Sequence, residues 1–341
     1  MSGVAERRSV VILASKDDVH ADAVVHECQL RGSEVFRFDP SALTGSLMSG
    51  GLMLTMDSQD ARLVFMGRTL RLSQVQNVLC RAWFIPDDEH DEQLPQKVKR
   101  HECHAALVGF FSCIPASAWL NPPWVEQQVE HKVVQSLAAK AAGFRVPRSL
   151  VTNDPASFRE FWNSCNGDVV IKQLSEISMV DCDNVGPAHY GFFTVKITDD
   201  QLAHIDEIRN SPCHFQERIE KCADIRAVVI DDVVVAYSIN SQDQEVSRTD
   251  FRRYPTARFS ATELPRAISA ALVSLNRTLG LRFSACDLAL TNEGNYVFFE
   301  ANPSGNWLWL ETPSHHPALD ALANALSDFG VEKVEAFEMA K

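Results

Sequence analysis

At 341 residues, the chain exceeds the roughly 100 to 200 residues of a usual domain, so we expect two or three folded domains. Its formal net charge of −13 argues against general binding to nucleic-acid backbones, and the absence of a run of about 18 apolar residues argues against a membrane span. The first residues, MSGVAERRSVVILAS, open directly into a strand pattern, which argues against a secretory leader. Nine scattered cysteines without a C-x-x-C pair are typical of reduced thiols, so we expect a cytoplasmic protein.

The N-terminal segment has the pattern of a βαβ unit. Strands are predicted from Ser9 to Ala14 and from Glu34 to Phe38, with a helix between them from about Asp18 to Arg31. Residues 14 to 19 read ASKDDV, where a dinucleotide-binding unit carries its glycine-rich turn. The pattern therefore argues against a dehydrogenase.

The next segments complete an N-terminal domain. A hairpin region is predicted from Leu52 to Leu72, a strand from Val78 to Phe84, and a helix in the stretch RHECHAALVGFFSC. The spacing of the histidines and cysteines in this helix matches no common zinc site, so we interpret it as an amphipathic helix packed on a core. These residues are His101, Cys103, His104 and Cys113. Prolines between residues 115 and 123 mark a domain boundary.

A helix is predicted to follow Asn121 and to end at Gly143. Lys132 lies beside its apolar face, and on its own this residue would be a solvated helix lysine. The apolar face consists of Val129, Val133, Leu137 and Ala141.

Two strands are then predicted, from Phe144 to Val151 and from Asp168 to Leu174. The second places Lys172 among β-branched residues, and a half-buried lysine needs an anion. A long polar segment separates it from the next strand, Gly191 to Ile197, and loops of this length inside domains are usually lids or binding loops. The small residues of this segment, which could cover a polyphosphate, include Ser175, Ser178 and Gly186.

The stretch FQERIEKCADIRAVVIDDVVVAYSI predicts three strands, the last two joined by a turn at Asp231-Asp232. Asp224 and Arg226 share a face, and they could form a structural ion pair or serve a functional site. Downstream, SRTDFRRYP gathers three arginines in an otherwise acidic chain, either as a solvated loop or as a site for an acidic substrate or phosphate. They are Arg248, Arg252 and Arg253.

Two apolar runs near the C-terminus predict a hairpin, from Phe283 to Leu290 and from Tyr296 to Asn302. The centre of its turn places Asp287 opposite Glu300. Because opposed carboxylates repel each other, either one of them is protonated or points to solvent, or a cation lies between them.

Strict alternation puts Asn302 on the same face as Glu300 and puts Phe299 on the opposite face. Two carboxylates and an amide oxygen form a set of ligands that suits Mg²⁺. We therefore interpret the hairpin as a magnesium site. A closing helix is predicted from Ala318 to Phe329.

These elements occur in the order found in ATP-grasp ligases: Lys132, Lys172, the QERI stretch, the DIR stretch and the magnesium hairpin. More closely, residues 115 to 330 resemble the ATP-grasp maturases of microviridin-type peptides, the graspetide synthetases. The stretches that carry the resemblance are NPPWVEQQVEHKVVQSLAAKAAGFRVPRSLVTN, FQERIEKCADIRAVV, TDFRR and CDLALTNEGNYVFFEANPSGNWLWLE.

The resemblance implies an α/β (α+β) ATP-grasp fold in three parts. These are an N-terminal α/β pre-ATP-grasp domain at residues 1–120, a central lid domain at 121–215 and a C-terminal catalytic domain at 216–341. By the same resemblance, the phosphates of ATP would be bound by Lys132 and Lys172, and its ribose by Asp224. The residues that would line the adenine are Gln216, Glu217 and Ile219.

The resemblance also implies the catalytic residues. Arg226 would face the transferring phosphate, and Arg252 belongs to the arginines that would steer the acidic substrate. The Mg²⁺ ion would be held by Asp287, Glu300 and Asn302. One departure occurs in the N-terminal domain, where RAWFIPDD has Phe84 and Ile85 in place of the arginines of a Trp-x-Arg-Arg-Pro motif.

The implied activity is the closure of ester or amide rings in a ribosomally made precursor peptide. A side-chain carboxylate of the peptide would attack the γ-phosphate of ATP, and a Ser or Thr hydroxyl or a Lys amine would then displace phosphate from the acyl phosphate. We expect a precursor with a separately bound leader and a core with acidic and Thr, Ser or Lys residues, and we expect the enzyme to be a homodimer. The alternative is a ligase that adds an amino acid to a peptide or small-molecule carboxylate.

Overall fold

We describe the protein from a computed structural model. The residues that it describes are 8–43, 53–55, 61–83, 94–174, 179–181, 188–190, 193–254 and 256–327. The chain forms two compact units, of which the first comprises Met1–Glu126, Gly280–Phe283 and Asn306–Lys341 and the second Gln127–Leu279 and Ser284–Gly305. The predicted domain boundaries near residues 120 and 215 stay predictions. No helix among the described residues is long and apolar enough to cross a membrane.

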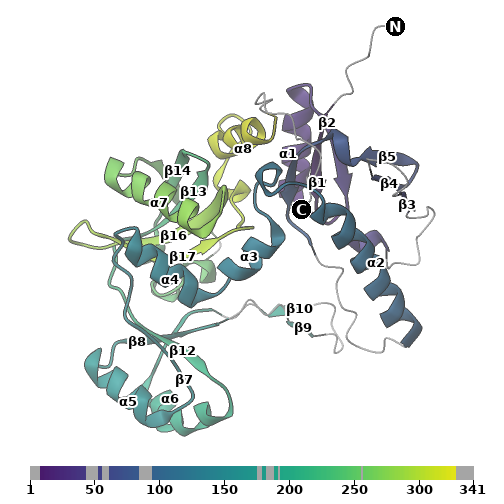
Figure 1. Cartoon of the computed structure of the whole chain (residues 1–341). Coiled ribbons are helices and arrows are strands. Elements are labelled where there is room, and N and C mark those ends of the chain that lie inside the picture. Colours follow the sequence, from purple (N-terminus) through teal and green to yellow (C-terminus); the bar gives the residue numbers. More distant parts are fainter. Residues whose placement is uncertain are drawn as a thin grey trace, which may run out of the picture. The chain divides into compact units, whose positions relative to one another are not determined.

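A three-stranded parallel sheet forms the centre of the first unit (Figure 1). Its order is β2-β1-β6, with β1 at Ser9–Leu13, β2 at Glu34–Phe38 and β6 at Val75–Cys80. Helix α1, at Val19–Leu30, connects β1 to β2, and the Asp18 carboxylate accepts hydrogen bonds from the backbone of its first turn. The predicted βαβ unit is confirmed.

Helices and a small sheet surround this central sheet. Helix α2, at Leu94–Ser112, packs with the antiparallel sheet β3-β4-β5 around the apolar side chains of Val11 and Leu13. Helix α8, at Pro317–Ser327, packs against α1. The small sheet confirms the predicted hairpin region, and its strands are β3 (Met53–Thr55), β4 (Arg62–Phe65) and β5 (Arg68–Arg71). Phe84 and Ile85, where the N-terminal motif departs from the family, lie outside the described residues.

The second unit contains a four-stranded antiparallel sheet, drawn with α5 and α6 in Figure 1. Its order is β11-β8-β12-β7, and helix α5, at Pro155–Ser164, packs on one face around Phe158 and Phe215. The strands are β7 (Ser149–Thr152), β8 (Val169–Lys172), β11 (Val195–Lys196) and β12 (Cys213–Glu217). The smaller elements nearby are β9 (Met179–Asp181), β10 (Ala188–Tyr190) and helix α6 (Asp199–Ala203).

Two predicted strands of this four-stranded sheet are shorter than expected. The strand predicted from residue 144 begins only at Ser149, because Pro147 has no N–H to donate to a ladder. The strand predicted from residue 191 is β11 alone within the described part of the chain. Ser175, Ser178 and Gly186 of the predicted binding loop lie outside the described residues.

This unit also contains a five-stranded sheet in the order β15-β14-β13-β16-β17. Helix α7, at Arg266–Leu279, packs against β13 and β14, and helix α4, at Lys132–Ala141, packs against β17. The strands are β13 (Ala223–Ile230), β14 (Val233–Ile239), β15 (Phe259–Thr262), β16 (Phe283–Leu290) and β17 (Tyr296–Asn302). The predicted turn at Asp231-Asp232 joins β13 to β14, with Asp231 at a φ of 49°.

The helix predicted from Asn121 to Gly143 is two helices. Helix α3 covers Pro123–Val129, the chain becomes extended at His131, and α4 then begins at Lys132. The break changes the face that is buried. Val133 and Leu137 of the predicted apolar face are 57% and 64% exposed, whereas the buried side chains of α4 are those of Gln135 and Ala139.

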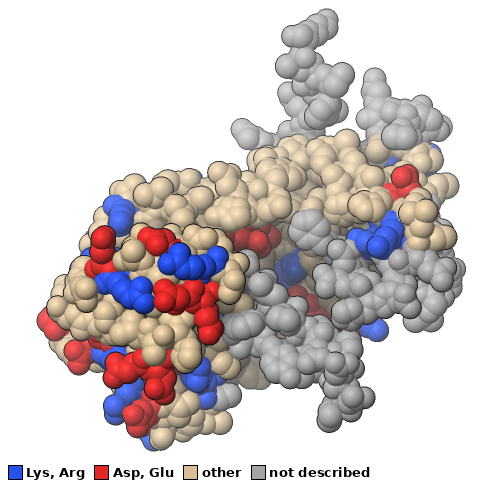
Figure 2. Space-filling model, turned by 90° about the horizontal axis from the view of Figure 1, so that it is seen from below, with Lys and Arg blue, Asp and Glu red and all other residues tan. Residues whose placement is uncertain are grey.

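Charged side chains of both signs are interspersed over the end of the second unit that carries α5 and α6 (Figure 2). Ion pairs there join Lys196 to Asp168 and Arg159 to Asp206. A surface with alternating signs lacks the single-sign field that attracts a nucleic-acid backbone. This face therefore gives no support to nucleic-acid binding.

Candidate active site

The hairpin of β16 and β17 places the two predicted carboxylates opposite each other. Asp287 pairs with Glu300 and Ala285 pairs with Asn302, as the sequence predicts. Nearer the turn, however, Leu288 pairs with Phe298, so β17 contains one extra residue at Phe299. The pairing of the carboxylates therefore depends on a β-bulge that the sequence did not indicate.

The bulge corrects one prediction about the faces of β17. Because an extra residue interrupts the alternation, Phe299 lies on the same side as Glu300 rather than on the opposite side. The ammonium groups of Lys172 and Lys221 lie 5.3 Å and 5.5 Å from the centre of the Phe299 ring. The ring is thus part of the site, where it contacts two cations.

Each of the opposed carboxylates has its own cation partner. Lys132 Nζ donates to Glu300 Oε2 over 2.6 Å, and Arg226 Nη1 donates to both carboxylate oxygens of Asp287 over 2.8 Å. Asp224 pairs instead with Lys221, 2.6 Å from its Oδ1. The possible Asp224–Arg226 ion pair is therefore replaced by two other pairs. The sequence predicted positive charge at this point but not these partners.

The two carboxylates have different proton affinities. Burial raises the pKa of Asp287 to about 6, and the Arg226 guanidinium offsets only part of this effect. Burial acts in the same direction on Glu300, but the charges of Lys132 and Lys172 outweigh it and lower the pKa of Glu300. Of the two carboxyl groups, Glu300 therefore loses its proton more readily.

The side chains fit a divalent cation as a set of oxygen ligands. Asp287 and Glu300 supply carboxylates, and Asn302 Nδ2 donates to Glu300 Oε1 over 3.3 Å, which leaves the amide oxygen as its ligand atom. Within the described ranges, no group of three or more His, Cys, Asp or Glu side chains could hold a metal. The amide of Asn302 is therefore the candidate third protein ligand beside the two carboxylates, and waters or phosphate oxygens would complete the coordination of Mg²⁺.

Lys172 ends β8 on the face of the sheet that carries His214. The two residues are direct partners in the β8–β12 ladder. Burial lowers the pKa of Lys172, and Glu300 is the anion that contributes most to keeping it charged. The predicted half-buried lysine is confirmed, and its environment includes both Lys132 and the candidate magnesium ligands.

His214 is a polar residue of this face that the sequence reading missed. Its side chain is 5% exposed, and its Nδ1 atom is buried without a hydrogen-bond partner. Burial, together with the charges of Lys172 and Lys132, lowers its pKa to about 4. A neutral imidazole therefore lies beside the lysines at neutral pH. The sequence did contain a signal: His214 and Gln216 are two positions apart on a strand, so their side chains lie on the same face of the sheet.

The predicted adenine-lining residues differ in their surroundings. Gln216 is buried and donates from Nε2 to Ser149 Oγ over 3.1 Å. Ile219 packs with Ala289, Val297 and Phe299. The carboxylate of Glu217 is held by two arginines, Arg145 and Arg148, so only its backbone is available to a ligand on the Gln216 face.

Asp224 has an acceptor atom that no group in the described part of the chain uses. Its Oδ2 atom is buried without a hydrogen-bond partner among those residues, while its Oδ1 atom accepts from Lys221. A buried acceptor without a donor is costly, and a hydroxyl group of a bound ligand would satisfy it. This atom fits the ribose contact that the resemblance implies.

The arginine segment is organised by Asp250, another residue that the sequence reading missed. Asp250 accepts from Arg252 Nη2 over 2.6 Å and from the backbone N–H of Thr194 over 2.9 Å. Arg252 and Arg253 both approach the ring of Phe193, at 5.8 Å and 4.9 Å from its centre. The hydrogen bond to Asp250 raises the pKa of Arg252. Two of the three predicted arginines are thus brought to one ring.

Gly305 permits the close packing behind the candidate metal ligands. A Cβ atom added there would lie 2.6 Å from Ala285 Cβ, 2.9 Å from Arg226 Nη2 and 3.0 Å from Asn302 Cβ. No real side chain fits at such distances without displacing its neighbours. The glycine therefore lets the chain pass directly beside Arg226.

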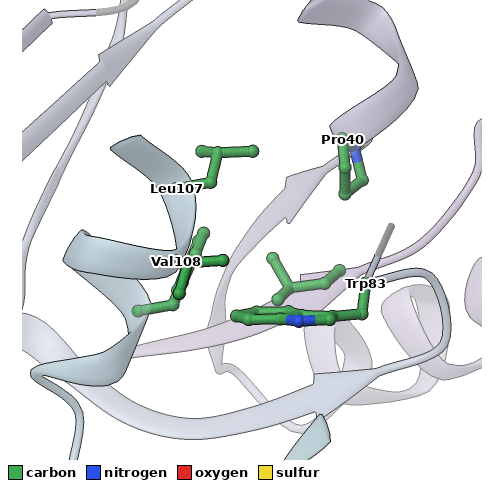
Figure 3. Close-up of a pocket in the computed structure, with 6 residues that line it drawn as sticks. Pro40, Trp83, Leu107 and Val108 are labelled. Atoms are coloured by element: carbon green, nitrogen blue, oxygen red, sulfur yellow. The ribbon is translucent and has the colours of Figure 1, made fainter. Parts of the chain in front are cut away.

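A small pocket in the first unit has a different character (Figure 3). Six apolar side chains line it, and Figure 3 shows Trp83 and Val108 side by side on its wall. The lining residues are Leu13, Pro40, Trp83, Leu107, Val108 and Phe111. It contains no group that could act as an acid, base, nucleophile or metal ligand, so we do not assign the chemistry to it.

Comparison with solved structures identifies the fold. The macrocyclase MdnC from Microcystis aeruginosa MRC, bound with the precursor peptide MdnA, aligns with a TM-score of 0.78 and 22% identity over 93% of this chain and 98% of MdnC. A RiPP-associated ATP-grasp ligase from Chryseobacterium gregarium, in complex with ADP and a leader and core peptide, aligns with a TM-score of 0.82 and 24% identity over 97% of this chain and 100% of the ligase.

The macrocyclase MdnB from Microcystis aeruginosa MRC has 26% identity and a TM-score of 0.74, over 95% of this chain and 100% of MdnB. No protein-family model and no curated protein matches the chain. The chain has the α/β fold of ATP-grasp ligases, and its structural neighbours include RiPP macrocyclases and ligases. The predicted fold and the predicted resemblance are confirmed.

Proposed function

We propose that the protein is an ATP-dependent ligase that closes ester or amide rings in a ribosomally made precursor peptide. The observation that carries the proposal is the hairpin in which Asp287 and Glu300 face each other between Lys132 and Arg226. This charge arrangement lies in a chain that aligns over nearly its whole length with RiPP macrocyclases.

The residues fit ATP and Mg²⁺ as cofactors. Mg²⁺ would be held by Asp287, Glu300 and Asn302, and with ATP it would supply the activated phosphoryl group and neutralise its charge. The lysines and Asp224 would bind the nucleotide, because burial and the nearby charge of Lys132 disfavour the cationic form of Lys172, which a phosphate would offset, and Asp224 retains an unused acceptor among the described residues. The solved neighbours include complexes with ADP, AMPPNP and Mg.

Arg226 and the lysines provide the positive charge that both chemical steps require. The attack of a peptide carboxylate on a phosphoryl group and the later release of phosphate both gather negative charge on oxygen atoms. Arg226 holds its guanidinium against Asp287 before any ligand binds, so its position is set in advance. The positioning of fixed cations is the main catalytic contribution of the protein in this proposal.

The proposed substrate is a precursor peptide with a leader and with a core rich in acidic and Thr, Ser or Lys residues. Arg252 is the residue best placed to steer the acidic core, because Asp250 fixes its guanidinium in an otherwise acidic chain. The proposal includes a homodimer in the cytoplasm. The location follows from the nine scattered cysteines without a C-x-x-C pair, which are typical of a protein in a reducing compartment.

Mass spectrometry tests the proposal directly. The enzyme, ATP and Mg²⁺ should convert a candidate precursor with a loss of about 18 Da for each ring, because each ester or amide closure removes one water. Asp287→Asn should give no product, whereas Asp232→Asn, an exposed control, should match the parent protein. A mass gain by one amino-acid residue would identify the intermolecular ligase instead. An unchanged precursor in the presence of hydrolysed ATP would reject ring closure.

A further inference from the structure

Gln135 is a buried amide at the point where helix α4 meets strand β17. Its side chain is 2% exposed and makes three hydrogen bonds. Nε2 donates to the carbonyl oxygens of Val129 and Ala301 over 2.8 Å and 2.9 Å, and Oε1 accepts from the backbone N–H of Ala301 over 2.9 Å. A single side chain therefore joins the end of α3, helix α4 and strand β17.

The amide of Gln135 acts as a ladder partner for Ala301. Strand β17 lies at the edge of its sheet, and the bridge that Arg145 makes on its outer side is at Val297, four residues before Ala301. Gln135 supplies both the donor and the acceptor that a neighbouring strand would have supplied to Ala301. Because Ala301 lies between Glu300 and Asn302, this contact holds the backbone on which both candidate magnesium ligands stand.

The same helix contacts β17 a second time one turn earlier. Lys132 and Gln135 are three residues apart and lie on neighbouring positions of the α4 surface. Lys132 holds the carboxylate of Glu300, and Gln135 holds the backbone of Ala301. The position of Lys132 relative to Glu300 therefore depends on how Gln135 attaches the helix to the strand.

The break between α3 and α4 is part of this arrangement. Gln135 Nε2 donates to the carbonyl oxygen of Val129, the last residue of α3. This bond satisfies a carbonyl that the helix itself leaves without a partner. It also fixes the point at which α4 begins, and α4 begins with Lys132.

We propose that Gln135 is a positioning residue that sets the geometry of Lys132, Glu300 and Asn302 and thereby the affinity of the site for a nucleotide with its divalent cation. The inference rests on the proposed function. Gln135 contacts no candidate ligand atom itself; it acts through the backbone of Ala301 and the first turn of α4.

Gln135→Met tests the proposal, since methionine has a similar length and makes none of the three hydrogen bonds. Binding of AMPPNP is measured by calorimetric titration over a series of Mg²⁺ concentrations. We expect the Mg²⁺ concentration that gives half-maximal binding to rise at least fivefold. Gln128→Met, an exposed glutamine on α3, is the matched control and should leave this concentration unchanged.

A double-mutant cycle separates positioning from general stability. If Gln135 acts through the Lys132–Glu300 contact, Gln135→Met should weaken binding about fivefold in the parent protein and less than twofold in a Lys132→Met background. Equal losses in both backgrounds would overturn the proposal, because they would show that Gln135 and Lys132 act on binding independently. The thermal midpoint of each variant is recorded beside its affinity.

Gln135→Glu keeps the proposal testable if the methionine variant does not fold. Glutamate retains the acceptor for the N–H of Ala301 but loses both donated hydrogen bonds. We expect a rise in half-maximal Mg²⁺ that is at least twofold, and no rise would overturn the proposal. Failure of the proposed function is a distinct result: the parent protein itself would then show no Mg²⁺-dependent binding of AMPPNP.

Discussion

Lys132 and Glu300 are 168 positions apart in the chain, yet they form an ion pair of 2.6 Å between Nζ and Oε2. The pair joins the first residue of α4 to a strand that is bulged at the preceding residue. Lys172 also acts on Glu300, so this carboxylate stays ionised although it is largely buried. The site therefore contains one ionised carboxylate before any metal ion binds.

Asp287→Asn should abolish Mg²⁺-dependent ATP turnover without loss of stability. Burial raises the pKa of Asp287 to about 6 even with Arg226 beside it, so ionising this carboxyl costs more in the folded than in the unfolded state, and the cost is fully present above about pH 6. A neutral amide removes this cost. We expect turnover to fall at least a hundredfold and the thermal midpoint at pH 7.5 to be no lower than that of the parent protein. Normal turnover by the folded variant would remove Asp287 from the metal site.

Lys172→Ala should weaken nucleotide binding about tenfold or more. Lys172 is a buried cation whose pKa is lowered by burial, and an anionic ligand would compensate that burial. Lys99→Ala, an exposed lysine on α2, is the control and should bind as the parent does. Calorimetric titration with ATP and Mg²⁺ measures both variants. Equal affinities would make Lys172 a structural residue only.

His214 should make the protein less stable in acid. Its pKa of about 4 in the folded state lies below the value near 6.5 of an unfolded histidine, so the unfolded state binds the proton more tightly between these values. The contribution is fully present above about pH 6.5 and is lost as the pH falls toward 4. At pH 5 the loss amounts to about 2 kcal/mol.

Urea unfolding of the parent and of His214→Gln at pH 7.5 and pH 5 measures this contribution. The glutamine variant should lose less unfolding free energy between the two pH values, by about 2 kcal/mol. His131→Gln removes an exposed histidine and should behave as the parent does. If the parent and His214→Gln lose the same unfolding free energy between the two pH values, His214 has the same pKa in the folded and unfolded states.

Arg252→Ala should slow ring closure and change which acidic residue of the precursor reacts. The guanidinium is fixed by Asp250, so its removal deletes a placed positive charge rather than a mobile one. Fragment-ion mass spectrometry of the product locates the rings, and Arg277→Ala, an arginine of an exposed ion pair, is the control. The steering role fails if the rate and the ring positions are both unchanged, even if the ligase activity is present.

Local periodicity in the sequence determined much of the secondary structure near the site. The β-branched neighbours of Lys172 on β8 predicted a half-buried lysine, and the centre of the hairpin turn predicted that Asp287 faces Glu300, a pairing that the structure reaches through the bulge. Side-chain spacing and turn composition are properties of neighbouring residues, so a sequence contains them directly. The βαβ unit of the first domain was predictable for the same reason.

Tertiary structure alone decided the partners of these residues. The cations that pair with the two carboxylates come from α4 and β13, and the amide that holds β17 comes from Gln135, which the helical pattern had left off the apolar face. A buried amide is favourable only when distant backbone groups satisfy it, and no local pattern shows where such groups lie. The same reason hid the bulge at Phe299, because a bulge depends on how two strands pack and not on the composition of either.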